Sequence, residues 1–352
     1  QHVALDHAHA RIVEAAGGEI GHRGVEAFLP GLDRVDRDGR GEALGIDADQ
    51  AGELRERAGL VRRNLGARGA LPVGNVPHAG VEDREGRAAR HVEMELPREM
   101  LPGLVHEARA FVEGGQAFIL WTALHADLEK SEDEAVATKA KDYMGLLTPV
   151  IKGVLTDQGF ANTVMAQQMF GGHGYIVEHG MEQFVRDARI AMLYEGANGI
   201  QALDLVGRKL PKDGGRALQA FFAEVQGFVK DKSADAAMKP YVEPLGKAAG
   251  HLQQATMWFM ANALGKPDNA GAGSMDYMQM FGLVALAYMW ARMAAAAQDK
   301  LKAGANGSEA RMNAKLVTGR FFMERVLPET AAQLARITAG AASVMELPAD
   351  QF

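Results

Sequence analysis

The residues with the clearest chemical potential lie between positions 168 and 201, and one carboxylate among them, Glu195, stands out. It follows the apolar residues 190–193 and precedes Gly196, where the backbone can turn and a flat ligand can approach closely. A carboxylate in dry, apolar surroundings has a raised pKa and can act as a general base. The N-terminus of a following helix would instead stabilise its anion. On spacing alone, the simpler interpretation that Glu195 caps that helix is favoured.

A glycine cluster upstream is equally ambiguous, because its small residues would admit a nucleotide backbone. It follows a predicted helix rather than a strand and does not form the G-x-G-x-x-G pattern, which excludes a Rossmann-type site. By themselves the glycines predict a helix end followed by a turn. They are Gly171, Gly172 and Gly174. The charged residues that follow the glycines in the sequence are Arg186, Asp187 and Arg189. The simplest expectation is that they form ion pairs on a helix.

The composition narrows the class of protein. The chain has 352 residues, of which 47% are apolar and 24% charged, with a formal net charge of −7, as is typical of a soluble globular protein. Such a chain has no net basic field to attract nucleic acid. The absence of Cys excludes disulfides, Cys-ligated metal centres and thiol nucleophiles, and no His spacing indicates another metal site. Without an 18-residue apolar run or a signal-peptide pattern, we expect a cytoplasmic protein with no membrane span.

Residues 1–107 differ from the rest of the chain. No Lys, Ser or Thr occurs before Thr122, whereas Arg, Gly, Ala and His are frequent. Ser and Lys are among the commonest residues of globular domains, so this composition is anomalous. It favours translation of GC-rich DNA in the wrong frame over the alternative of a genuine but biased segment. We therefore assign no function to residues 1–107 and expect them to be poorly ordered.

From about residue 108 the apolar periodicity predicts helices almost throughout, and strand signals are nearly absent. An all-α fold is therefore expected. Ser131 is the predicted N-cap of the second helix, with Glu134 completing a capping box, and the glycines after residue 170 are predicted to end the third. The predicted helices of this first region, 108–210, are residues 108–128, 133–157, 159–170, 180–193 and 198–209.

A linker with Lys, Pro and Gly at residues 209–215 precedes a second helical region, 211–352. Four or five long helices are expected to pack there as an up-and-down bundle. The pattern predicts a loop at residues 265–273, a long helix at 275–302, and two last helices divided by Pro328. The Met residues are expected to fill the core or, as the less favoured alternative, to line a flexible binding surface. They are Met275, Met278, Met280, Met289 and Met293.

Three motifs in order carry more information than any one of them alone. Residues 168–175 are Gln-Met-Phe-Gly-Gly-His-Gly-Tyr, residues 186–189 Arg-Asp-Ala-Arg, and residues 193–201 Leu-Tyr-Glu-Gly-Ala-Asn-Gly-Ile-Gln. Residues 108–210, which contain them, resemble the C-terminal helical domain of the acyl-CoA dehydrogenases. Residues 211–352 resemble the extra C-terminal helical domain of longer members, a branch that includes the 3-methylmercaptopropionyl-CoA dehydrogenases.

This resemblance implies an oxidoreductase of fatty acid metabolism that dehydrogenates an acyl-CoA thioester to a trans-2-enoyl-CoA with FAD. Glu195 matches the catalytic base that takes the α-proton, and its backbone N–H matches a group that binds the thioester carbonyl. Tyr194 matches a substrate-binding residue beside the acyl chain. Because the family usually has Thr in place of Ala197, weaker FAD binding is expected. The implied FAD contacts are Gln168 and Gly172 toward the FAD of a neighbouring subunit, and Ala197 and Gly199 toward the FAD of their own.

The resemblance also implies partners, namely an acyl-CoA substrate, electron-transfer flavoprotein as electron acceptor, and further copies of the chain in a homodimer or homotetramer. It does not extend to residues 1–107, which lack the motifs of the family's N-terminal helical domain and middle β-domain. The chain is therefore expected to be a fragment, inactive alone. Two alternatives stay open, a non-catalytic helical interaction fragment and a flavin oxidase on the same fold.

Overall fold

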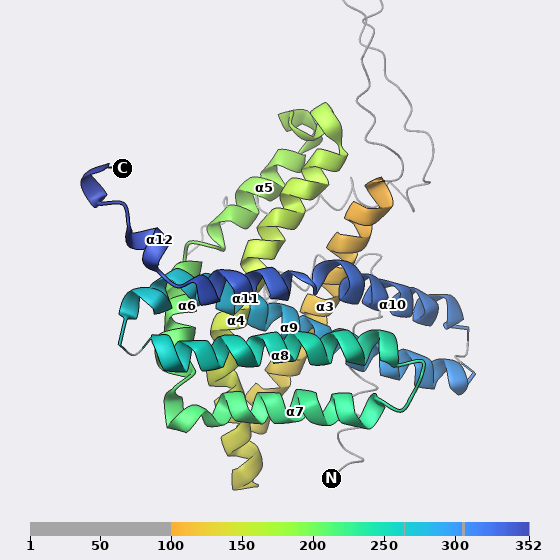
Figure 1. Cartoon of the computed structure of the whole chain (residues 1–352). Helices are drawn as coiled ribbons and strands as arrows, with labels where there is room; N and C mark the ends of the chain where they lie inside the picture. The colour runs from red at the N-terminus through yellow and green to blue at the C-terminus, as the bar shows by residue number, and fades with distance from the viewer. Residues whose placement is uncertain (1–99, 264, 305–306, 352) are drawn as a thin grey trace, which may run out of the picture. The chain divides into compact units, whose positions relative to one another are not determined.

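The computed structural model of the chain describes residues 100–263, 265–304 and 307–351, and the regular elements of this part are all helical (Figure 1). The all-α prediction is therefore confirmed for the described residues, whereas the predictions for residues 1–99 lie outside them. Two π-helical turns, η5 (Leu205–Lys209) and η7 (Phe322–Val326), extend α6 and α10. The α-helices are α3 (Met100–Leu128), α4 (Glu134–Met169), α5 (Met181–Ile190), α6 (Asn198–Asp204), α7 (Arg216–Lys232), α8 (Lys239–Asn262), α9 (Pro267–Lys302), α10 (Glu309–Phe321), α11 (Glu329–Ala339) and α12 (Ala342–Met345).

Helix α4 begins with a different cap from the predicted one. The N-cap is Asp133, whose carboxylate accepts hydrogen bonds from the N–H groups of Ala135 at 2.9 Å and Val136 at 3.3 Å. The predicted capping box of Ser131 and Glu134 is therefore wrong. Asp133 directly precedes the first helical residue, and from that position a short carboxylate reaches the free N–H groups of the first turn.

The same helix continues through the interruption that the sequence predicted at residues 157–159. Helices 133–157 and 159–170 are a single helix that ends at Met169. A lone glycine such as Gly159 costs a helix only about 1 kcal/mol, which the packing of so long a helix offsets. The predicted stop at the glycine pair is confirmed, because Gly171 has the left-handed φ of +58°.

Helices α3 and α9 both begin earlier than the sequence predicted. Helix α3 starts at Met100, so residues 100–107 are helical although they were assigned to the anomalous segment. Helix α9 starts at Pro267, so most of the loop predicted at residues 265–273 is helix. Proline suits a first turn because its missing N–H has no intrahelical partner there. Gly273 lies so close to Phe259 that a Cβ would be 2.9 Å from its ring, which explains a glycine inside this helix.

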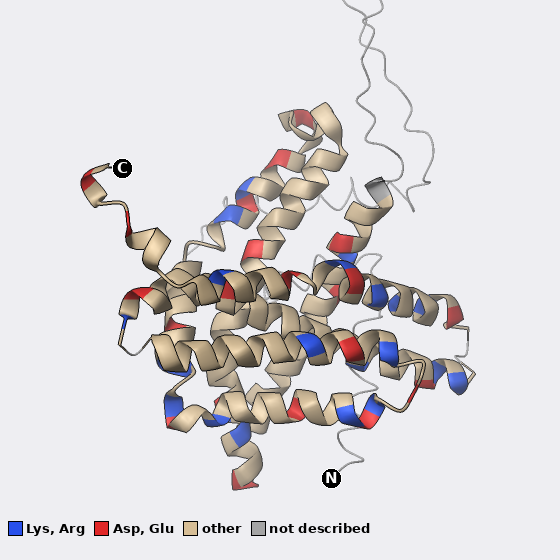
Figure 2. Ribbon diagram, viewed as in Figure 1, with Lys and Arg blue, Asp and Glu red and all other residues tan. Residues whose placement is uncertain are grey.

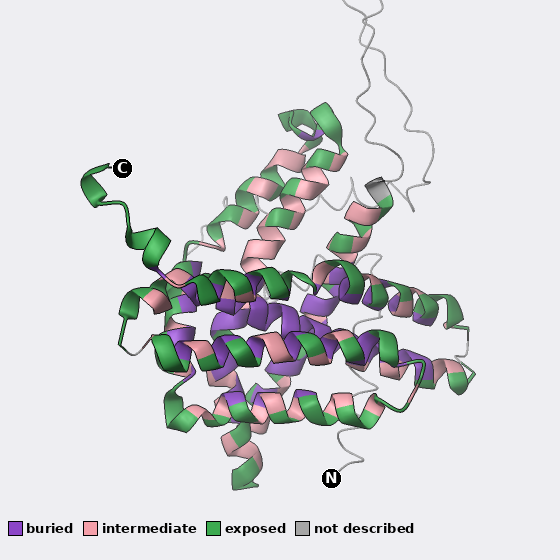
Figure 3. Cartoon of the chain, viewed as in Figure 1, coloured by how far each residue is buried: buried purple, intermediate pink, exposed green. Residues whose placement is uncertain are grey.

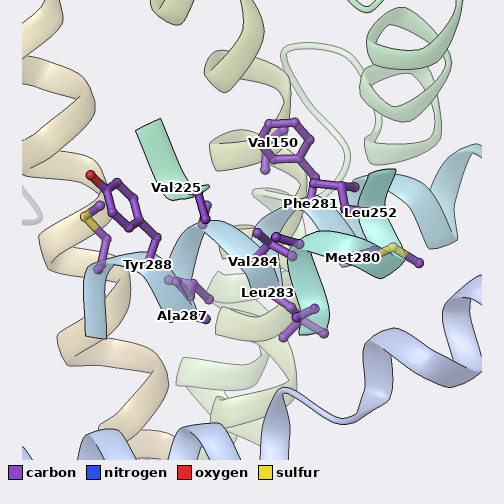
Figure 4. Close-up of a cluster of buried hydrophobic side chains, with 14 of the residues drawn as sticks. Val150, Val225, Leu252, Met280, Phe281, Leu283, Val284, Ala287 and Tyr288 are labelled. Atoms are coloured by element: carbon purple, nitrogen blue, oxygen red, sulfur yellow. The ribbon is translucent and has the colours of Figure 1, made fainter. Parts of the chain in front are cut away.

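Helix α9 runs through the middle of the described bundle and supplies much of its core. Between Asp276 and Arg292 it has no charged residue. Figures 2 and 3 show this central part of α9 as uncharged and buried among the more polar helices α7, α8, α10 and α11. Figure 4 shows its Phe281 and Val284 near Val150 of α4 and Leu252 of α8. Helix α9 is long and apolar enough to cross a membrane, but most of that stretch is buried in the bundle, as expected of a core helix.

The methionines of α9 mostly fill this core, as predicted. Only Met275, near the start of the helix, is exposed among the five, with 37% of its surface accessible. The buried ones are Met278, Met280, Met289 and Met293. A flexible unbranched side chain fills irregular gaps between large aromatic neighbours, and Trp290 and Phe281 on the same helix are fully buried.

The hydrophobic core is continuous across the two helical regions that the sequence predicted. One cluster of buried side chains includes Phe118 and Leu146 from the first region and Phe221 and Phe281 from the second. The indole N–H of Trp290 on α9 also donates a hydrogen bond to the carbonyl of Ala110 on α3 at 3.0 Å. The division predicted at residues 210 and 211 therefore separates the sequence motifs but not the core.

A polar cluster centred on Glu224 joins α7 to α4 and α9. Its carboxylate accepts hydrogen bonds from Lys139 Nζ at 2.8 Å, the Tyr143 hydroxyl at 2.8 Å and the Tyr288 hydroxyl at 3.1 Å. Burial by itself would raise the pKa of the Glu224 carboxyl, but the hydrogen bond and charge of Lys139 and the hydroxyl of Tyr143 outweigh it and keep the pKa below its ordinary value. The hydroxyls of Tyr143 and Tyr288 thus have the ionised Glu224 carboxylate as their hydrogen-bond acceptor.

Replacing Glu224 with Ala is expected to lower the free energy of unfolding by about 1–3 kcal/mol for each buried tyrosine hydroxyl that loses its acceptor. The matched control is Asp231→Ala on the same helix, because Asp231 is exposed and pairs with its neighbour Lys232 at 3.0 Å. It should change stability by less than about 0.5 kcal/mol. Urea unfolding followed by circular dichroism measures both, and equal effects would contradict a bridging role for Glu224.

Candidate functional site

The candidate base Glu195 lies on a tight turn between α5 and α6. The turn is closed by the N–H of Asn198, which donates to the carbonyl of Met192 at 3.2 Å. Within it Glu195 has a φ of +57° and Gly196 a φ of +82°. Glycine adopts this left-handed conformation readily, whereas for a residue with a Cβ it costs roughly 1–2 kcal/mol. Surrounding contacts must therefore hold Glu195 in this conformation.

Two side chains bind the carbonyl groups of the turn. Gln201 Nε2 donates to the carbonyl of Glu195 at 2.9 Å, and Lys152 Nζ donates to the carbonyl of Gly196 at 2.8 Å. A Cβ at position 196 would lie 2.8 Å from Gln201 Nε2. Glycine is thus favoured here both by the positive φ and by the close approach of the Gln201 amide. The turn is fixed from α6 on one side and from α4 on the other.

Behind the turn, Asn198 connects these groups to α4 and α9. It is only 5% exposed; its Oδ1 accepts from Lys152 Nζ at 2.7 Å, and its Nδ2 donates to Asp157 Oδ1 at 2.6 Å. The second oxygen of Asp157 accepts from Gln279 Nε2 at 2.7 Å. Both ends of the Asn198 amide and both oxygens of the Asp157 carboxylate thus have partners, as stable buried networks require. We call Lys152, Asp157, Asn198, Gln201 and Gln279 the turn network.

The side chain of Glu195 is exposed, and it does not cap α6. The N-cap of α6 is Ala197, which provides no side-chain hydrogen bond to the helix. The capping interpretation that spacing favoured is therefore wrong. The dry surroundings expected around Glu195 are also not present within the described residues, because Tyr194 and Leu193 beside it are about half exposed. The turn presents Glu195 on an apolar but open surface.

The glycine cluster forms the turn that the sequence predicted. Residues Gly171–Gly174 make a single 3-10 turn, η3, after α4. Gly174 packs against the end of α4 so tightly that a Cβ would collide with the Gln167 carbonyl, and Gln167 Nε2 donates to the Gly174 carbonyl at 3.1 Å. Gln168 and Gly172, the first pair of predicted FAD contacts, are exposed, and a Cβ on Gly172 would meet nothing within 4 Å.

The predicted FAD contacts fall into two groups that one chain does not bring together. Gln168 and Gly172 lie at the C-terminal end of α4, whereas Ala197 and Gly199 lie beside Lys152, more than four helical turns earlier, or roughly 24 Å at 1.5 Å per residue. All four are exposed. The backbone of Gly172 and Gly199 is unobstructed, which is compatible with close approach of a nucleotide. We call these two separate groups of predicted contacts the half-sites.

The hairpin of α4 and α5 between these half-sites exposes many apolar side chains, and Figure 3 shows α5 as largely accessible. Exposed apolar surfaces of this extent mark interaction sites more often than solvent-facing helices. The side chains include Phe170, Tyr175, Val177, Phe184, Ile190 and Leu193. The ion pairs predicted on α5 are not among the salt bridges of the described residues; Asp187 accepts from Gln183 at 2.6 Å, and Arg189 lies over the Phe160 ring at 5.9 Å.

Sequence reasoning missed three members of the turn network. Lys152 and Asp157 were assigned to a helix without a role, and Gln279 to a core helix. One signal was available for the first two, since they place charges on a helix that otherwise presents the apolar face Leu147, Val150 and Val154. No pattern in the sequence places Gln279 near Asp157, because 122 residues separate them.

Two regions of the chain match the sequence models of known protein domains. Residues 121–210 match the sequence model of the acyl-CoA dehydrogenase C-terminal domain, and residues 221–348 match the model described as acetyl-CoA dehydrogenase C-terminal like. The C-terminal part of the chain is of the acyl-CoA dehydrogenase family. The resemblance inferred from the three motifs is thereby confirmed, and the first matched region contains the whole Glu195 turn.

Two curated relatives, both enzymes, support the same family. The 3-methylmercaptopropionyl-CoA dehydrogenase of Ruegeria pomeroyi is 33% identical over 65% of this chain and 39% of its own length. The broad-specificity linear acyl-CoA dehydrogenase FadE5 of Mycobacterium tuberculosis is 32% identical over 62% of this chain and 38% of its own. The chain thus spans about two fifths of the length of these two enzymes. The crystal structure of Caenorhabditis elegans ACDH-11 in complex with C11-CoA superposes on 65% of this chain, and the aligned part is 35% of that protein. The sequence identity is 19% and the TM-score is 0.48.

The buried carboxyl of Asp157 predicts that the stability of the protein depends on pH. Burial raises the pKa of the Asp157 carboxyl, against the opposing hydrogen bonds from Asn198 and Gln279. The Asp157 carboxyl therefore binds its proton more tightly in the folded protein than in the unfolded chain. Ionising this carboxyl lowers the free energy of unfolding at pH values above the folded-state pKa, and this loss of stability disappears on acidification. Asp157→Asn, which retains an oxygen for Asn198, should therefore raise the melting temperature more at pH 7 than at pH 4.

The control for this prediction is a carboxyl whose pKa is shifted in the opposite direction. A hydrogen bond from Arg208 lowers the pKa of the Asp204 carboxyl, so Asp204 stabilises the fold at neutral pH and loses that effect in acid. Asp204→Asn should lower the melting temperature at pH 7, with a smaller decrease at pH 4. Thermal unfolding at both pH values checks the pair, and a pH-independent effect of Asp157→Asn would contradict the burial argument.

Proposed function

We propose that this chain carries the catalytic base of an FAD-dependent acyl-CoA dehydrogenase, and that Glu195 is that base. The observation that carries the proposal is the Glu195 turn, in which the side chains of Lys152 and Gln201 hold a strained backbone by hydrogen bonds while the carboxylate itself stays exposed. A helix cap or an ordinary surface Glu needs no such support. Strained residues that the surrounding structure over-determines cluster at active sites, and the family match covers this turn.

The chemistry assigned to the chain's own residues is a proton abstraction. The Glu195 carboxylate takes the α-proton of the acyl thioester, and the electron pair of that C–H bond forms the new α,β double bond as the β-hydrogen leaves as hydride. The N–H of Glu195 donates to no atom of the described residues, so it is available for the thioester carbonyl, whose polarisation acidifies the α-proton. Tyr194 lies beside the acyl chain. FAD, when bound, supplies the acceptor for the hydride.

The two half-sites support an assembly of at least two copies. Because Gln168 and Gly172 lie far along α4 from Ala197 and Gly199, we propose that each FAD lies between half-sites of two chains, in a homodimer or homotetramer. The exposed apolar surface of the α4–α5 hairpin is compatible with burial in such an assembly. The proposed electron acceptor is electron-transfer flavoprotein. The relatives' names indicate acyl-CoA thioesters as the substrate class.

Flavin reduction separates this function from its alternatives, and it is tested in a longer form of the protein in which the family's N-terminal helical domain and middle β-domain precede the helical regions. Bound flavin that is bleached by an acyl-CoA without oxygen, and stays bleached when air is admitted, supports a dehydrogenase. Rapid reoxidation by air would indicate an oxidase. A longer form that binds no flavin at any concentration, yet still associates with itself, would be a helical interaction module and would refute the proposal.

Glu195→Gln is expected to slow flavin bleaching by roughly 10²–10⁴-fold, the contribution of a positioned general base. The substitution keeps the side-chain size and the backbone N–H, so FAD and acyl-CoA should still bind. Glu182→Gln, an acidic residue on nearby α5, is the matched control and should leave the rate unchanged. Stopped-flow absorbance under anaerobic conditions measures all three proteins. A normal rate for Glu195→Gln would show that the base lies elsewhere.

Ala197→Thr is expected to strengthen both α6 and the proposed cofactor site. Ala197 is the N-cap without a side-chain hydrogen bond, and Thr there gains about 1 kcal/mol of stability. A hydroxyl at this position should also tighten FAD binding by roughly tenfold, the value of one hydrogen bond. Ala197→Val has the same shape without the hydroxyl and should gain neither. Melting temperatures and titration of flavin fluorescence measure the two effects, and a gain in stability without one in affinity would contradict the FAD contact.

A further inference from the structure

The turn network reaches Glu195 from a helix that belongs to the second matched region. Gln279 lies on α9, within residues 221–348, whereas the turn and α4 lie within residues 121–210. The hydrogen bond from Gln279 Nε2 to Asp157 Oδ2, at 2.7 Å, connects the two. From there the connection passes through Asn198 to Lys152 and the carbonyl of Gly196. Four consecutive hydrogen bonds thus separate α9 from the residue that follows the base.

The register between α9 and α4 is fixed at this point by close packing. A Cβ on Gly153 would collide with the Met278 side chain, and a Cβ on Gly282 would lie 2.6 Å from Val154. The two helices therefore touch immediately on both sides of Gln279. Close-packed interiors have few voids that could absorb a displacement, so these contacts fix the position of the Gln279 amide relative to α4.

The order of donors and acceptors in the turn network assigns Gln279 a specific structural role. Asn198 presents its oxygen to Lys152 and its amide nitrogen to three acceptors, of which Asp157 Oδ1 at 2.6 Å is the nearest and the charged one. The other two are the Gly153 carbonyl at 3.2 Å and the Thr156 hydroxyl at 2.9 Å. Gln279 occupies the other oxygen of the Asp157 carboxylate and so fixes its rotation. Without Gln279, Asp157 would be drawn toward the positive charges of Lys152 and Arg189, both of which act on it. Asn198 would then lose the nearest and only charged of its three acceptors.

We propose that Gln279 is a positioning residue for Glu195, and that it sets the conformation of the Glu195 turn through Asp157 and Asn198. The second helical region thereby takes part in the chemistry of the first. This inference rests on the proposed function for its catalytic meaning, but its structural content is independent of flavin. Gln279 does not contact the turn itself, and its effect is transmitted by a polar chain whose every link can be altered.

The first test measures hydrogen exchange of the 352-residue chain by mass spectrometry. Gln279→Met keeps the length of the side chain and removes the donor. It should speed exchange of the amides of Asn198, Ile200 and Gln201 by about tenfold, as expected for the loss of one hydrogen bond. The matched control is Gln298→Met on the same helix, which removes a 2.9 Å hydrogen bond to the Ala237 carbonyl and should leave those amides unchanged. Faster exchange throughout α8 as well would show that Gln279 only stabilises the fold, and would overturn the inference.

A reversal of polarity makes the test sharper. Gln279→Glu alone places two carboxylates against each other and should speed exchange of the turn at least as much as Gln279→Met. With Asp157→Asn added, residue 157 can donate to the new carboxylate and still accept from Asn198, so exchange should return to within about twofold of the parent chain. A role in packing alone predicts no such rescue, and a double variant no better than Gln279→Glu would overturn the inference.

The catalytic consequence is measured separately in the FAD-loaded protein. Gln279→Met should lower the maximal rate of flavin bleaching while leaving the acyl-CoA concentration for half-maximal rate nearly unchanged, because positioning of the base affects the chemical step rather than binding. If Glu195→Gln bleaches at a normal rate while the exchange results are as expected, the proposed function fails and the coupling stands. If Glu195→Gln is slow but Gln279→Met exchanges like the parent chain, the positioning inference fails alone.

Discussion

The arrangement of the candidate site depends on how closely α9 passes α4. Gly153 and Gly282 remove the side chains that would separate the two helices, and Met278 and Val154 occupy the space. Because the interior is close-packed, this approach sets the distance between every other group on the two helices. It brings Gln279 within hydrogen-bonding distance of Asp157, and it makes the core of α9 continuous with that of α4. A pair of helices one Cβ further apart would share neither the core nor the polar connection.

The second constraint is the left-handed backbone at Glu195. A non-glycine residue in this conformation is maintained only where other contacts determine the turn, and here both carbonyl groups of the turn accept hydrogen bonds from side chains of other elements. The conformation leaves the Glu195 N–H and carboxylate without partners among the described residues. Strain and unfilled hydrogen-bonding capacity at one residue are what a site for an external carbonyl and an acidic proton requires.

The sequence predicted the parts of this structure that depend on local pattern. Apolar periodicity located most helices, the glycine pair ended α4, and the ordered motifs around Glu195 indicated the family; that Glu195 is the base stays a prediction. The predictions that were wrong concern features that tertiary contacts determine. Asp133 replaced Ser131 as a cap because of a backbone conformation that composition does not show. The continuity of α4 through Gly159 and the early start of α9 depend on packing, and the contact of Gln279 with Asp157 depends on a helix crossing formed by residues far apart in the chain.

The same distinction explains why the site of one chain looks incomplete. A general base functions best where water is excluded, because a low dielectric strengthens its interactions with substrate, yet Glu195, Tyr194 and Leu193 are all exposed. The polar network beneath the turn is already fully paired and needs nothing more. The apolar surface above it is not covered by any described residue. Under the proposed function, the described residues supply the pre-organised half of a site, and surfaces that pack over the α4–α5 hairpin are the proposed source of the side chains that exclude water from Glu195.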